Sequence, residues 1–404
     1  MCSLQSWDDA PTLTPFTAPR GGVSALRAAG QVLMDDYDVH VLGAGIVGRS
    51  LALALARAGL RVALQAEGAR APGASDVRAY ALNAASVELL RGLKVWDALP
   101  TDAATPVLDM HVRGDARASA IDFSAWQQRV SALAWISDAA VLERELASAV
   151  RFAPHITVVS ADAPVRAALT ALCEGKASAS RAALGVSFER VDYGHQAIAA
   201  RLTSTRGHQG IARQWFRAPD VLALLPFDTP QRGHSYALVW SLPDDRADAL
   251  RALPPAEFER ALMAATGGEA GVLSLASERA AWPLMQGHAS AWCGPGWVLL
   301  GDAAHVVHPL AGQGLNLGLA DVAALVEVIC QREPWRALGD EKLLRRYARE
   351  RVAPTWAMGQ VTDGLLQLFS NEAPALRELR NRGLSLVNRL PPLKRWLTTR
   401  ALDS

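Results

Sequence analysis

The stretch YDVHVLGAGIVG, residues 37–48, is the strongest indication of the fold. Its first half has the composition of a buried strand, and it runs directly into Gly43, Ala44, Gly45 and, three residues later, Gly48. In such a turn the first glycine allows a tight bend, the second lets a pyrophosphate approach the backbone, and the third permits close packing of the following helix. The stretch therefore predicts a dinucleotide-binding turn.

The residues after this turn continue the same unit. The segment SLALALARAG, residues 50–59, predicts a helix capped by Gly59, and residues 60–64 predict a second strand. An acidic residue usually ends that strand and binds the adenosine ribose about 20 residues past the glycines. Gln65 stands there instead, and Glu67 lies on the opposite side of an extended chain or beyond its end. We expect neutral Gln65 to hydrogen-bond the ribose and to bind adenosine less tightly.

A second motif, LGDAAHVVHPLAGQGLNLG at residues 300–318, describes a flavin site. A buried strand at residues 298–300 is expected to deliver an aspartate to the ribityl hydroxyls, and a glycine-bearing turn then opens a long apolar helix. The free N–H groups of such a helix end are suited to hold the negative charge of a reduced isoalloxazine. The residues expected at the flavin are Asp302, Pro309, Gly312, Gln313, Gly314, Leu315 and Asn316, with Pro309 and Gly312 also expected to shape the pocket over it.

The two motifs and their order resemble those of the FAD-dependent aromatic hydroxylases, and within them the ubiquinone-biosynthesis hydroxylases that include the Coq-type enzymes. The resemblance covers residues 35–404 and includes DVRAYALNAAS at 76–86, which is similar to that subfamily's D-x-R-x-x-A-L-x-x-x-S signature. LAWI at 133–136 and the residues at 208–216 are similar as well. By this resemblance Arg78 lies near the FAD, where it neutralises a phosphate or helps govern reduction; the alternative is a surface ion pair.

One motif of the resembled family is altered in this chain. The usual Asp-Gly element, thought to touch both flavin and nicotinamide, appears as CEGKASASR at residues 173–181, in which Gly175, Ser178 and Arg181 keep their places. Glu174 preserves the charge but adds a methylene, which displaces the carboxylate and loosens its positioning. Reaction with a nicotinamide donor is therefore a weaker expectation than FAD binding.

The resemblance implies a monooxygenase that uses FAD, O₂ and NAD(P)H. Reduced flavin would add O₂ to give a C4a-hydroperoxide, and an electron-rich aromatic ring would take the distal oxygen. The protein would exclude water, stabilise the flavin anion and orient the ring, and no side chain is assigned as a catalytic base. The leading interpretation is hydroxylation of a polyprenylated ubiquinone precursor. The alternatives are hydroxylation of a small soluble phenol, and a non-catalytic FAD-binding scaffold among other ubiquinone-biosynthesis proteins.

The predicted fold is α/β: a Rossmann-like FAD-binding domain interleaved with an antiparallel-sheet substrate domain, followed by C-terminal helices. Alternating runs such as AIAARL and YALVWSL indicate the antiparallel sheet. Residues 1–33 have no periodic apolar face and are expected to be a disordered extension or a mis-assigned start. The predicted division is 35–106, 137–186 and 284–334 for the FAD-binding domain, 107–136 and 187–283 for the substrate domain, and 335–404 for the helical region.

Composition fits a large globular enzyme. The 404 residues carry a net charge of +1, which gives no support for nucleic-acid binding, and half of them are apolar. The four cysteines form no C-x-x-C pair and favour a reducing, cytoplasmic location, with Cys173 read as a small core residue rather than a reactive thiol. The basic segment at residues 377–400 fits either peripheral contact with the inner membrane or a packed helix with a solvated face.

Two further groups of residues have competing interpretations. His305 and His308 have the spacing of an H-x-x-H metal pair, but the accompanying glutamate is missing and both lie inside the flavin motif, so we expect structural roles and no metal. Tyr80, Trp135 and Trp240 are candidates for substrate contact. Aromatic residues in apolar runs more often belong to the core, which is the expectation here.

Overall fold

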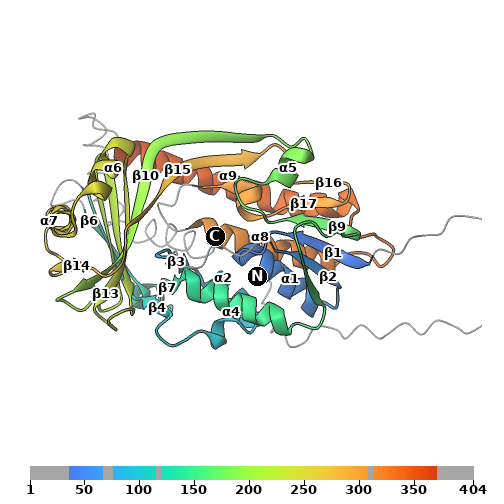
Figure 1. Ribbon diagram of the computed structural model, residues 1–404, viewed down its shortest axis with the longest axis horizontal. Coiled ribbons are helices and arrows are strands. Elements are labelled where there is room, and N and C mark those ends of the chain that lie inside the picture. The colour runs from blue at the N-terminus through green and yellow to red at the C-terminus, as the bar shows by residue number, and fades with distance from the viewer. Residues whose placement is uncertain (1–35, 67–75, 115–119, 308–312, 371–404) are drawn as a thin grey trace, which may run out of the picture.

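The computed structural model describes residues 36–66, 76–114, 120–307 and 313–370. In this part of the chain a parallel sheet with its helices forms one half of the molecule and an antiparallel sheet forms the other (Figure 1). The predictions for residues 1–33, for a helix break near 371–374 and for the basic segment 377–400 lie outside the described residues.

A six-stranded sheet holds the glycine turn. Its neighbouring strands pair in parallel, except that the edge strand β16 runs antiparallel to β17. The strands, in spatial order, are β16 (Cys293–Gly294), β17 (Trp297–Leu299), β9 (Ala167–Leu172), β1 (Tyr37–Leu42), β2 (Val62–Gln65) and β8 (Ile156–Val159). Because parallel strands are buried on both faces, they are nearly continuous runs of apolar residues, as in the VHVL of β1.

Five helices belong to this half of the molecule. They are α1 (Ile46–Arg57), α2 (Ala84–Gly92), α4 (Ala139–Phe152), α8 (Gln313–Cys330) and α9 (Glu341–Ser370). α1 packs against both α8 and α4, and α8 also packs against α9. By length and composition α8 is the one described helix that could cross a membrane, but 61% of its apolar window is buried, as expected of a core helix.

The antiparallel sheet is built around the long strand β10. Apart from the parallel pair of β5 with β11, its neighbours pair antiparallel, so the runs AIAARL and YALVWSL lie side by side in β10 and β13, as predicted. The strands are β18 (His305–Val306), β15 (Ala280–Ala289), β10 (Phe188–Ser204), β13 (Ser235–Pro243), β12 (Asp220–Phe227), β11 (Ile211–Arg217), β5 (Asp109–Arg113) and β6 (Ala120–Ser124), with β14 (Leu273–Leu275) beside β10.

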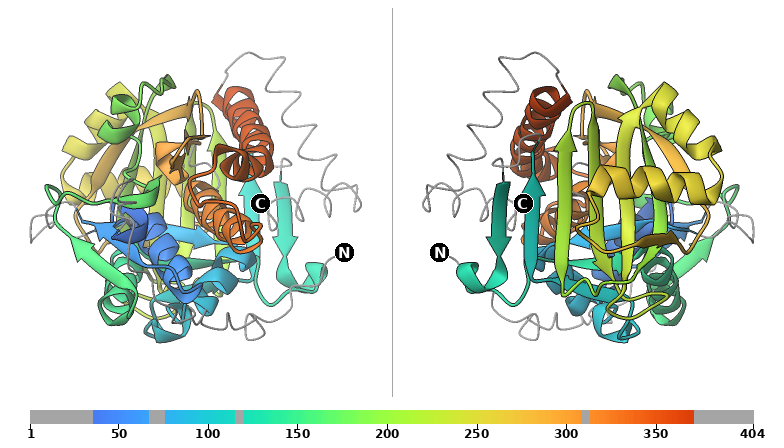
Figure 2. Two further views of the ribbon diagram at one scale, coloured as in Figure 1. Left: turned by 90° about the vertical axis from the view of Figure 1, so that its right-hand side faces the viewer. Right: turned by 90° about the vertical axis from the view of Figure 1, so that its left-hand side faces the viewer.

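The two faces of this sheet have different neighbours. α6 (Asp244–Ala252) and α7 (Pro255–Thr266) lie on the outer face, away from the parallel sheet (Figure 2). A separate core of buried side chains, including Trp215, Trp240 and Phe258, fills the space beneath these helices. The inner face is directed toward the nucleotide-binding half, and the small sheet of β3 (Ala79–Leu82), β7 (Ala134–Asp138) and β4 (Ala104–Val107) lies between the two halves.

Remaining short elements connect these units: α3 (Ala125–Gln128), α5 (Ala179–Ala183) and the 3₁₀ turns η2 (Trp96–Ala98) and η3 (Gly301–Ala303). The chain passes between the two halves several times, as the interleaved arrangement predicts. The exact domain limits stay a prediction.

Element boundaries differ slightly from the predicted ones. The helix expected at residues 50–59 begins earlier, at Ile46, because Gly45 is extended and already acts as its N-cap. The strand expected at 60–64 begins at Val62, since Leu60 still donates its N–H to the carbonyl of Leu55 in the turn that closes α1. Gly59 adopts the left-handed conformation in that turn, with φ of +83°.

Candidate functional site

The glycine turn between β1 and α1 combines close packing with one open position. Gly43 has φ of +98°, and a Cβ there would lie 2.5 Å from the carbonyl oxygen of Cys173. A Cβ on Gly48 would lie 1.9 Å from the carbonyl oxygen of Gly43, so neither site admits a side chain. A Cβ on Gly45 would meet nothing within 4 Å. The N-terminus of α1 has no side-chain cap and no acidic residue in its first turn, so its N–H groups suit an anion.

Gln65 stands at the end of β2, where the sequence places it. Its main-chain carbonyl accepts a hydrogen bond of 3.2 Å from the N–H of Gly43, which ties the strand end to the glycine turn. Burial lowers the pKa of the neighbouring His40, and hydrogen bonding to the side chain of Gln65 partly opposes this shift. The side chain of Gln65 therefore lies near the ring of His40.

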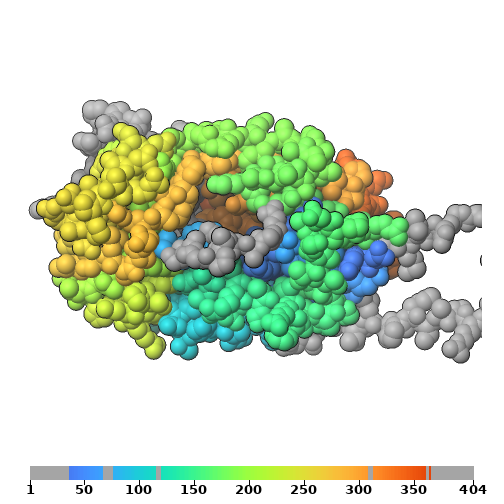
Figure 3. Space-filling model, viewed as in Figure 1, coloured from blue at the N-terminus to red at the C-terminus, as the bar shows by residue number. Residues whose placement is uncertain are grey.

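Asp302 lies in η3, directly after β17. The residue is exposed to solvent although many protein atoms surround its side chain. A residue on the wall of a recess has both properties. Burial raises the pKa of Asp302, and electrostatic interaction with His305, Lys176 and Arg78 only partly counters this effect. Figure 3 shows the surface hollowed between the antiparallel sheet and the nucleotide-binding half.

The first turn of α8 begins at Gln313, and its N–H groups have no partner within a helix. The side chain of Asn316 is buried and fully used by the protein. Its Oδ1 accepts hydrogen bonds from the N–H of Asn83 and from Oγ of Ser86, at 3.1 and 2.8 Å, and its Nδ2 donates to the carbonyl of Ala81 at 2.9 Å. These contacts connect the D-x-R-x-x-A-L-x-x-x-S stretch to the start of α8.

Arg78 is half-buried and ion-paired. Its Nε donates to Oδ1 of Asp76 at 2.8 Å, its Nη2 lies 3.3 Å from Oε1 of Glu143, and the guanidinium lies 5.8 Å from the ring centre of Tyr80. Hydrogen bonding to Asp76 raises the pKa of Arg78, so its charge is permanent and largely balanced. Burial raises the pKa of Tyr80 to about 12, and its phenol stays protonated at neutral pH.

A buried charged network beneath η3 was missed by the sequence analysis. Asp321, fully buried in α8, accepts hydrogen bonds from Nε2 of His305 at 2.6 Å, from the N–H of Gly301 at 2.9 Å and from Nε of Arg351 at 2.8 Å. Burial opposes ionisation, but His305 and Arg351 hold the pKa of Asp321 below its usual value. An aspartate inside the apolar run LGLADVAALV of α8 was the available signal.

His305 has a structural environment. Its Nε2 is occupied by Asp321, and its ring stacks on Trp292 with centres 4.9 Å apart. His308, its partner in the H-x-x-H spacing, lies outside the described residues, as do Pro309 and Gly312. Among the described residues there is no group of three or more metal-ligating side chains.

Glu174 is held by serines of its own loop. Its carboxylate accepts hydrogen bonds from Oγ of Ser178 and, at 2.8 Å, from Oγ of Ser180. Arg181 from the same loop donates to the carbonyl of Ala303 at 2.8 Å, and its guanidinium lies 4.1 Å from the ring centre of Phe188. The altered motif therefore still packs against the turn that carries Asp302.

The remaining candidates lie in or against the core. Trp240 is 1% exposed and lies on the outer face of the antiparallel sheet. The sheet therefore separates it from the flavin motif. Trp135 is half-buried and packs edge-on against Trp96, with ring centres 6.2 Å apart. Cys173 is buried beside the glycine turn, and burial raises the pKa of its thiol.

The fold and the uncapped helix end after the glycine turn are those of an FAD-dependent monooxygenase. Residues 36–148 and 150–362 match the family described as FAD binding domain, and the chain belongs to that family. A protein of Escherichia coli (strain K12) named 3-demethoxyubiquinol 3-hydroxylase is 30% identical over 391 residues, which are 90% of this chain and 98% of that protein. The ubiquinone hydroxylase UbiL of Rhodospirillum rubrum is 30% identical, covering 91% of this chain and 90% of UbiL.

Solved structures agree on the fold. The probable FAD-dependent monooxygenase PqsL from Pseudomonas aeruginosa superposes with a TM-score of 0.71 at 21% identity, over 86% of this chain and 99% of PqsL. The p-nitrophenol 4-monooxygenase PnpA from Pseudomonas putida gives the same TM-score at 18% identity, over 90% of this chain and 98% of PnpA. The predicted aromatic-hydroxylase type of fold is therefore confirmed.

The described residues fit FAD. The open space at Gly45 lies at the uncapped N-terminus of α1, where backbone N–H groups suit a pyrophosphate. Asp302 is an exposed residue with Lys176 and Arg78 nearby, and the first N–H groups of α8 have no partner within that helix.

Proposed function

We propose that this monooxygenase hydroxylates the aromatic ring of a polyprenylated ubiquinone precursor, with NAD(P)H as the electron donor and O₂ as the source of oxygen. The observation that carries this proposal is the match, over nearly their whole length, to two proteins named as ubiquinone-pathway hydroxylases. When bound and reduced, FAD supplies the activated oxygen. The chain's own residues bind the cofactor, orient the ring and exclude water.

We assign the cofactor contacts as follows. Gly43, Ala44, Gly45 and Gly48, with the N-terminus of α1, hold the pyrophosphate, which is supported by the uncapped helix end and the open space at Gly45. Gln65 binds the adenosine ribose through its side-chain amide, which lies near His40. The neutral amide suits a hydroxyl partner but adds no charge-assisted hydrogen bond, so its contribution to affinity is modest.

At the other end of the cofactor, Asp302 holds the ribityl hydroxyls, and the N–H groups of Gln313, Gly314, Leu315 and Asn316 hold the pyrimidine edge of the flavin. The first N–H groups of α8, which have no partner within that helix, support this assignment. Because the side chain of Asn316 is used within the protein, its contribution to the cofactor is through the backbone. Pro309 and Gly312 stay predicted pocket residues.

Arg78 contributes a balanced positive charge at the edge of the site. Its ion pairs with Asp76 and Glu143 fix the guanidinium, and it lowers the pKa of Asp302 by its charge. We propose that it stabilises anionic groups of the bound cofactor without moving far from Asp76. The protein is further proposed to be cytoplasmic with peripheral contact to the inner membrane, where a polyprenyl tail would reside.

A deletion experiment tests the function. We expect a strain without the gene to lose ubiquinone and to accumulate a prenylated precursor that lacks one hydroxyl group, measured by mass spectrometry of lipid extracts. The wild-type gene should restore ubiquinone, whereas Gly45→Val, which fills the pyrophosphate space, should not. Normal ubiquinone without an accumulated precursor would favour a small soluble phenol as substrate. Restoration by Gly45→Val would favour the non-catalytic scaffold.

A further inference from the structure

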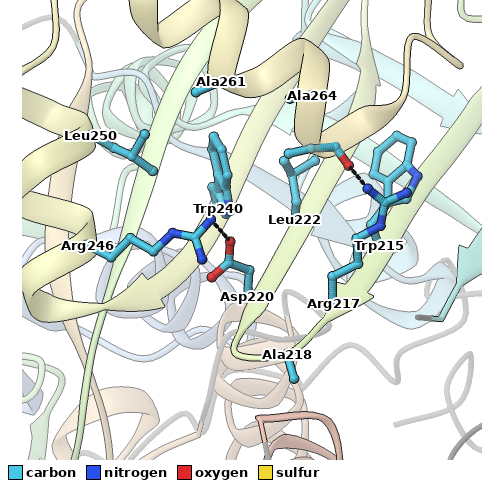
Figure 4. A pocket seen from close by; sticks show the side chains of 11 residues that line it. Trp215, Arg217, Ala218, Asp220, Leu222, Trp240, Arg246, Leu250, Ala261 and Ala264 are labelled. Atoms are coloured by element: carbon cyan, nitrogen blue, oxygen red, sulfur yellow. Dashed lines mark hydrogen bonds and ion pairs between the residues drawn. The ribbon is translucent and has the colours of Figure 1, made fainter. Parts of the chain in front are cut away.

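A cavity lies on the outer face of the antiparallel sheet, under α6 and α7 (Figure 4). This face is directed away from the parallel sheet and its glycine turn, as the arrangement of the two sheets in Figure 1 shows. The cavity has a volume of about 420 Å³, which is within the usual range for small-molecule sites, roughly 300–1,000 Å³. Its floor is formed by β11, β12 and β13, and its walls by α6 and α7. None of the cofactor contacts assigned above lines it.

The sequence of α7 explains why the cavity exists. Ala261, Ala264 and Ala265 follow the spacing that places side chains on one helix face, and this face looks over the sheet where Leu222 lies. Phe258 and Leu262 of the same helix are fully buried and hold it against the sheet. Larger residues in place of the alanines would have filled the space.

The polar groups of the cavity have an excess of positive charge. Asp220, 8% exposed, pairs with Arg246 across 2.9 Å, so these two charges balance. Arg217 donates to the main-chain carbonyl of Ala265 at 2.8 Å, and among the described residues it forms no ion pair (Figure 4). One cation is therefore left without a counter-charge at the mouth of the cavity.

Buried hydrogen-bonding groups remain unused there. The indole N–H of Trp215 is buried and finds no acceptor in the described part of the chain. Burial raises the pKa of Asp220, which Arg246 and the nearby indole of Trp240 oppose, yet Oδ1 of Asp220 makes no hydrogen bond of normal geometry with a described residue. Buried polar atoms without partners are rare in folded proteins and call for an explanation such as a bound ligand.

We propose that this cavity binds a small organic carboxylate with an apolar body. The carboxylate lies at the mouth beside Arg217, the arginine without an ion-pair partner among the described residues, and completes the charge balance there. The body lies over Leu222, between Leu250 and the alanines of α7, and a hydroxyl or amide on it is positioned to reach Asp220. Binding of a second anion in the cavity is disfavoured because Asp220 already neutralises Arg246.

The test is calorimetric titration of the FAD-loaded protein with 3-phenylpropionate, and with 3-phenylpropan-1-ol as the uncharged analogue. We expect one site, at which the carboxylate binds at least tenfold more tightly than the alcohol. Arg217→Gln should lower the affinity for the carboxylate about tenfold, which is the effect of losing one charge-assisted contact. Ala264→Phe, which fills the cavity from an exposed helix position, should abolish binding.

Matched controls lie on the same helix. Arg260→Gln and Ala256→Phe change exposed residues of α7 that do not line the cavity, and we expect both to bind like the wild type. The visible spectrum of the flavin should stay unchanged throughout, because a ligand beside the flavin would perturb it. The proposal would be overturned if the wild type bound no carboxylate at millimolar concentration, or if it bound the alcohol as tightly as the carboxylate. Binding that survives both Arg217→Gln and Ala264→Phe would overturn it as well.

Discussion

Arg201, on the long strand β10, donates a hydrogen bond of 2.8 Å from Nη2 to the main-chain carbonyl of Arg78. The same Nη2 lies 3.1 Å from Oδ2 of Asp138, whose Oδ1 accepts the N–H of Val141 at the start of α4. The guanidinium also lies 3.9 Å from the ring centre of Phe227. One buried side chain of the antiparallel sheet thus fixes the main chain at Arg78, directly before β3.

Replacing Arg201 should be costly to stability. Arg201→Met would leave Asp138 and the carbonyl of Arg78 without their partner, and we expect a loss of about 3 kcal/mol in the free energy of unfolding. Arg190→Met is the control, since that arginine pairs with Asp192 on the surface and should change stability by less than about 0.5 kcal/mol. Urea unfolding measures both. Equal effects of the two changes would show that the buried contacts of Arg201 contribute little.

Alanine at Gly45 should affect FAD binding, whereas alanine at Gly48 should affect the stability of the fold. Gly45→Ala adds a methyl group that meets no protein atom within 4 Å, so the free energy of unfolding of the FAD-free protein should change by less than about 0.5 kcal/mol. The methyl would occupy the proposed pyrophosphate space and should weaken FAD at least tenfold. Gly48→Ala places its Cβ 1.9 Å from a carbonyl oxygen and should destabilise the fold itself. Thermal unfolding and flavin fluorescence titration separate these effects, and unchanged FAD affinity in Gly45→Ala would argue against the assigned pyrophosphate position.

Asp302 should stabilise cofactor binding at the expense of the FAD-free protein. Its pKa is raised in the folded chain, so the folded state holds its proton more tightly than the unfolded state does. The stability that this carboxyl contributes is present below its unfolded pKa and is lost as the pH rises through the folded value. Asp302→Asn should therefore stabilise the FAD-free protein more at neutral pH than at pH 4, and should weaken FAD binding.

Urea unfolding of Asp302→Asn and wild type at several pH values checks this sign. The difference in free energy of unfolding should grow with pH. A gain that is the same at pH 4 and pH 7 would mean that the charge of Asp302 is not what the substitution removes.

The network of His305, Asp321 and Arg351 should be needed for the shape of the flavin turn. Asp321→Asn would leave the buried end of Arg351 uncompensated, and we expect a loss of about 3 kcal/mol. The pKa of Asp321 is lowered, so its contribution is present above the unfolded pKa and is lost as the pH falls toward the folded value. Glu327→Gln, an exposed change on the same helix, is the control. Similar melting temperatures for Asp321→Asn and the control would contradict the network's structural role.

Local patterns were enough to predict the nucleotide-binding unit. The glycine spacing and the apolar runs identified β1, α1, β2 and the flavin helix, because each depends on neighbours within a few residues. The limits shifted where capping chemistry decided them, as at Gly45 and Leu60. The antiparallel sheet was predicted as a class, from alternation, without its strand order.

Long-range contacts could not be predicted in this way. Asp321 lies 16 residues from His305 and 30 residues from Arg351, and Arg201 lies 123 residues from Arg78. Nothing in the local sequence pairs these side chains; the packing of helices on sheets brings them together. The outer-face cavity likewise depends on where α6 and α7 lie over the sheet, although the alanines that leave it open are visible in the sequence.

The most direct test of the central claim uses isotopic oxygen. The purified, FAD-loaded protein is incubated with NAD(P)H, ¹⁸O₂ and the prenylated precursor extracted from the deletion strain. The mass of the product is then measured by mass spectrometry. The account predicts a product with one added ¹⁸O atom on the aromatic ring and NAD(P)H oxidation that depends on the precursor. FAD-loaded protein that leaves the precursor unchanged would contradict it.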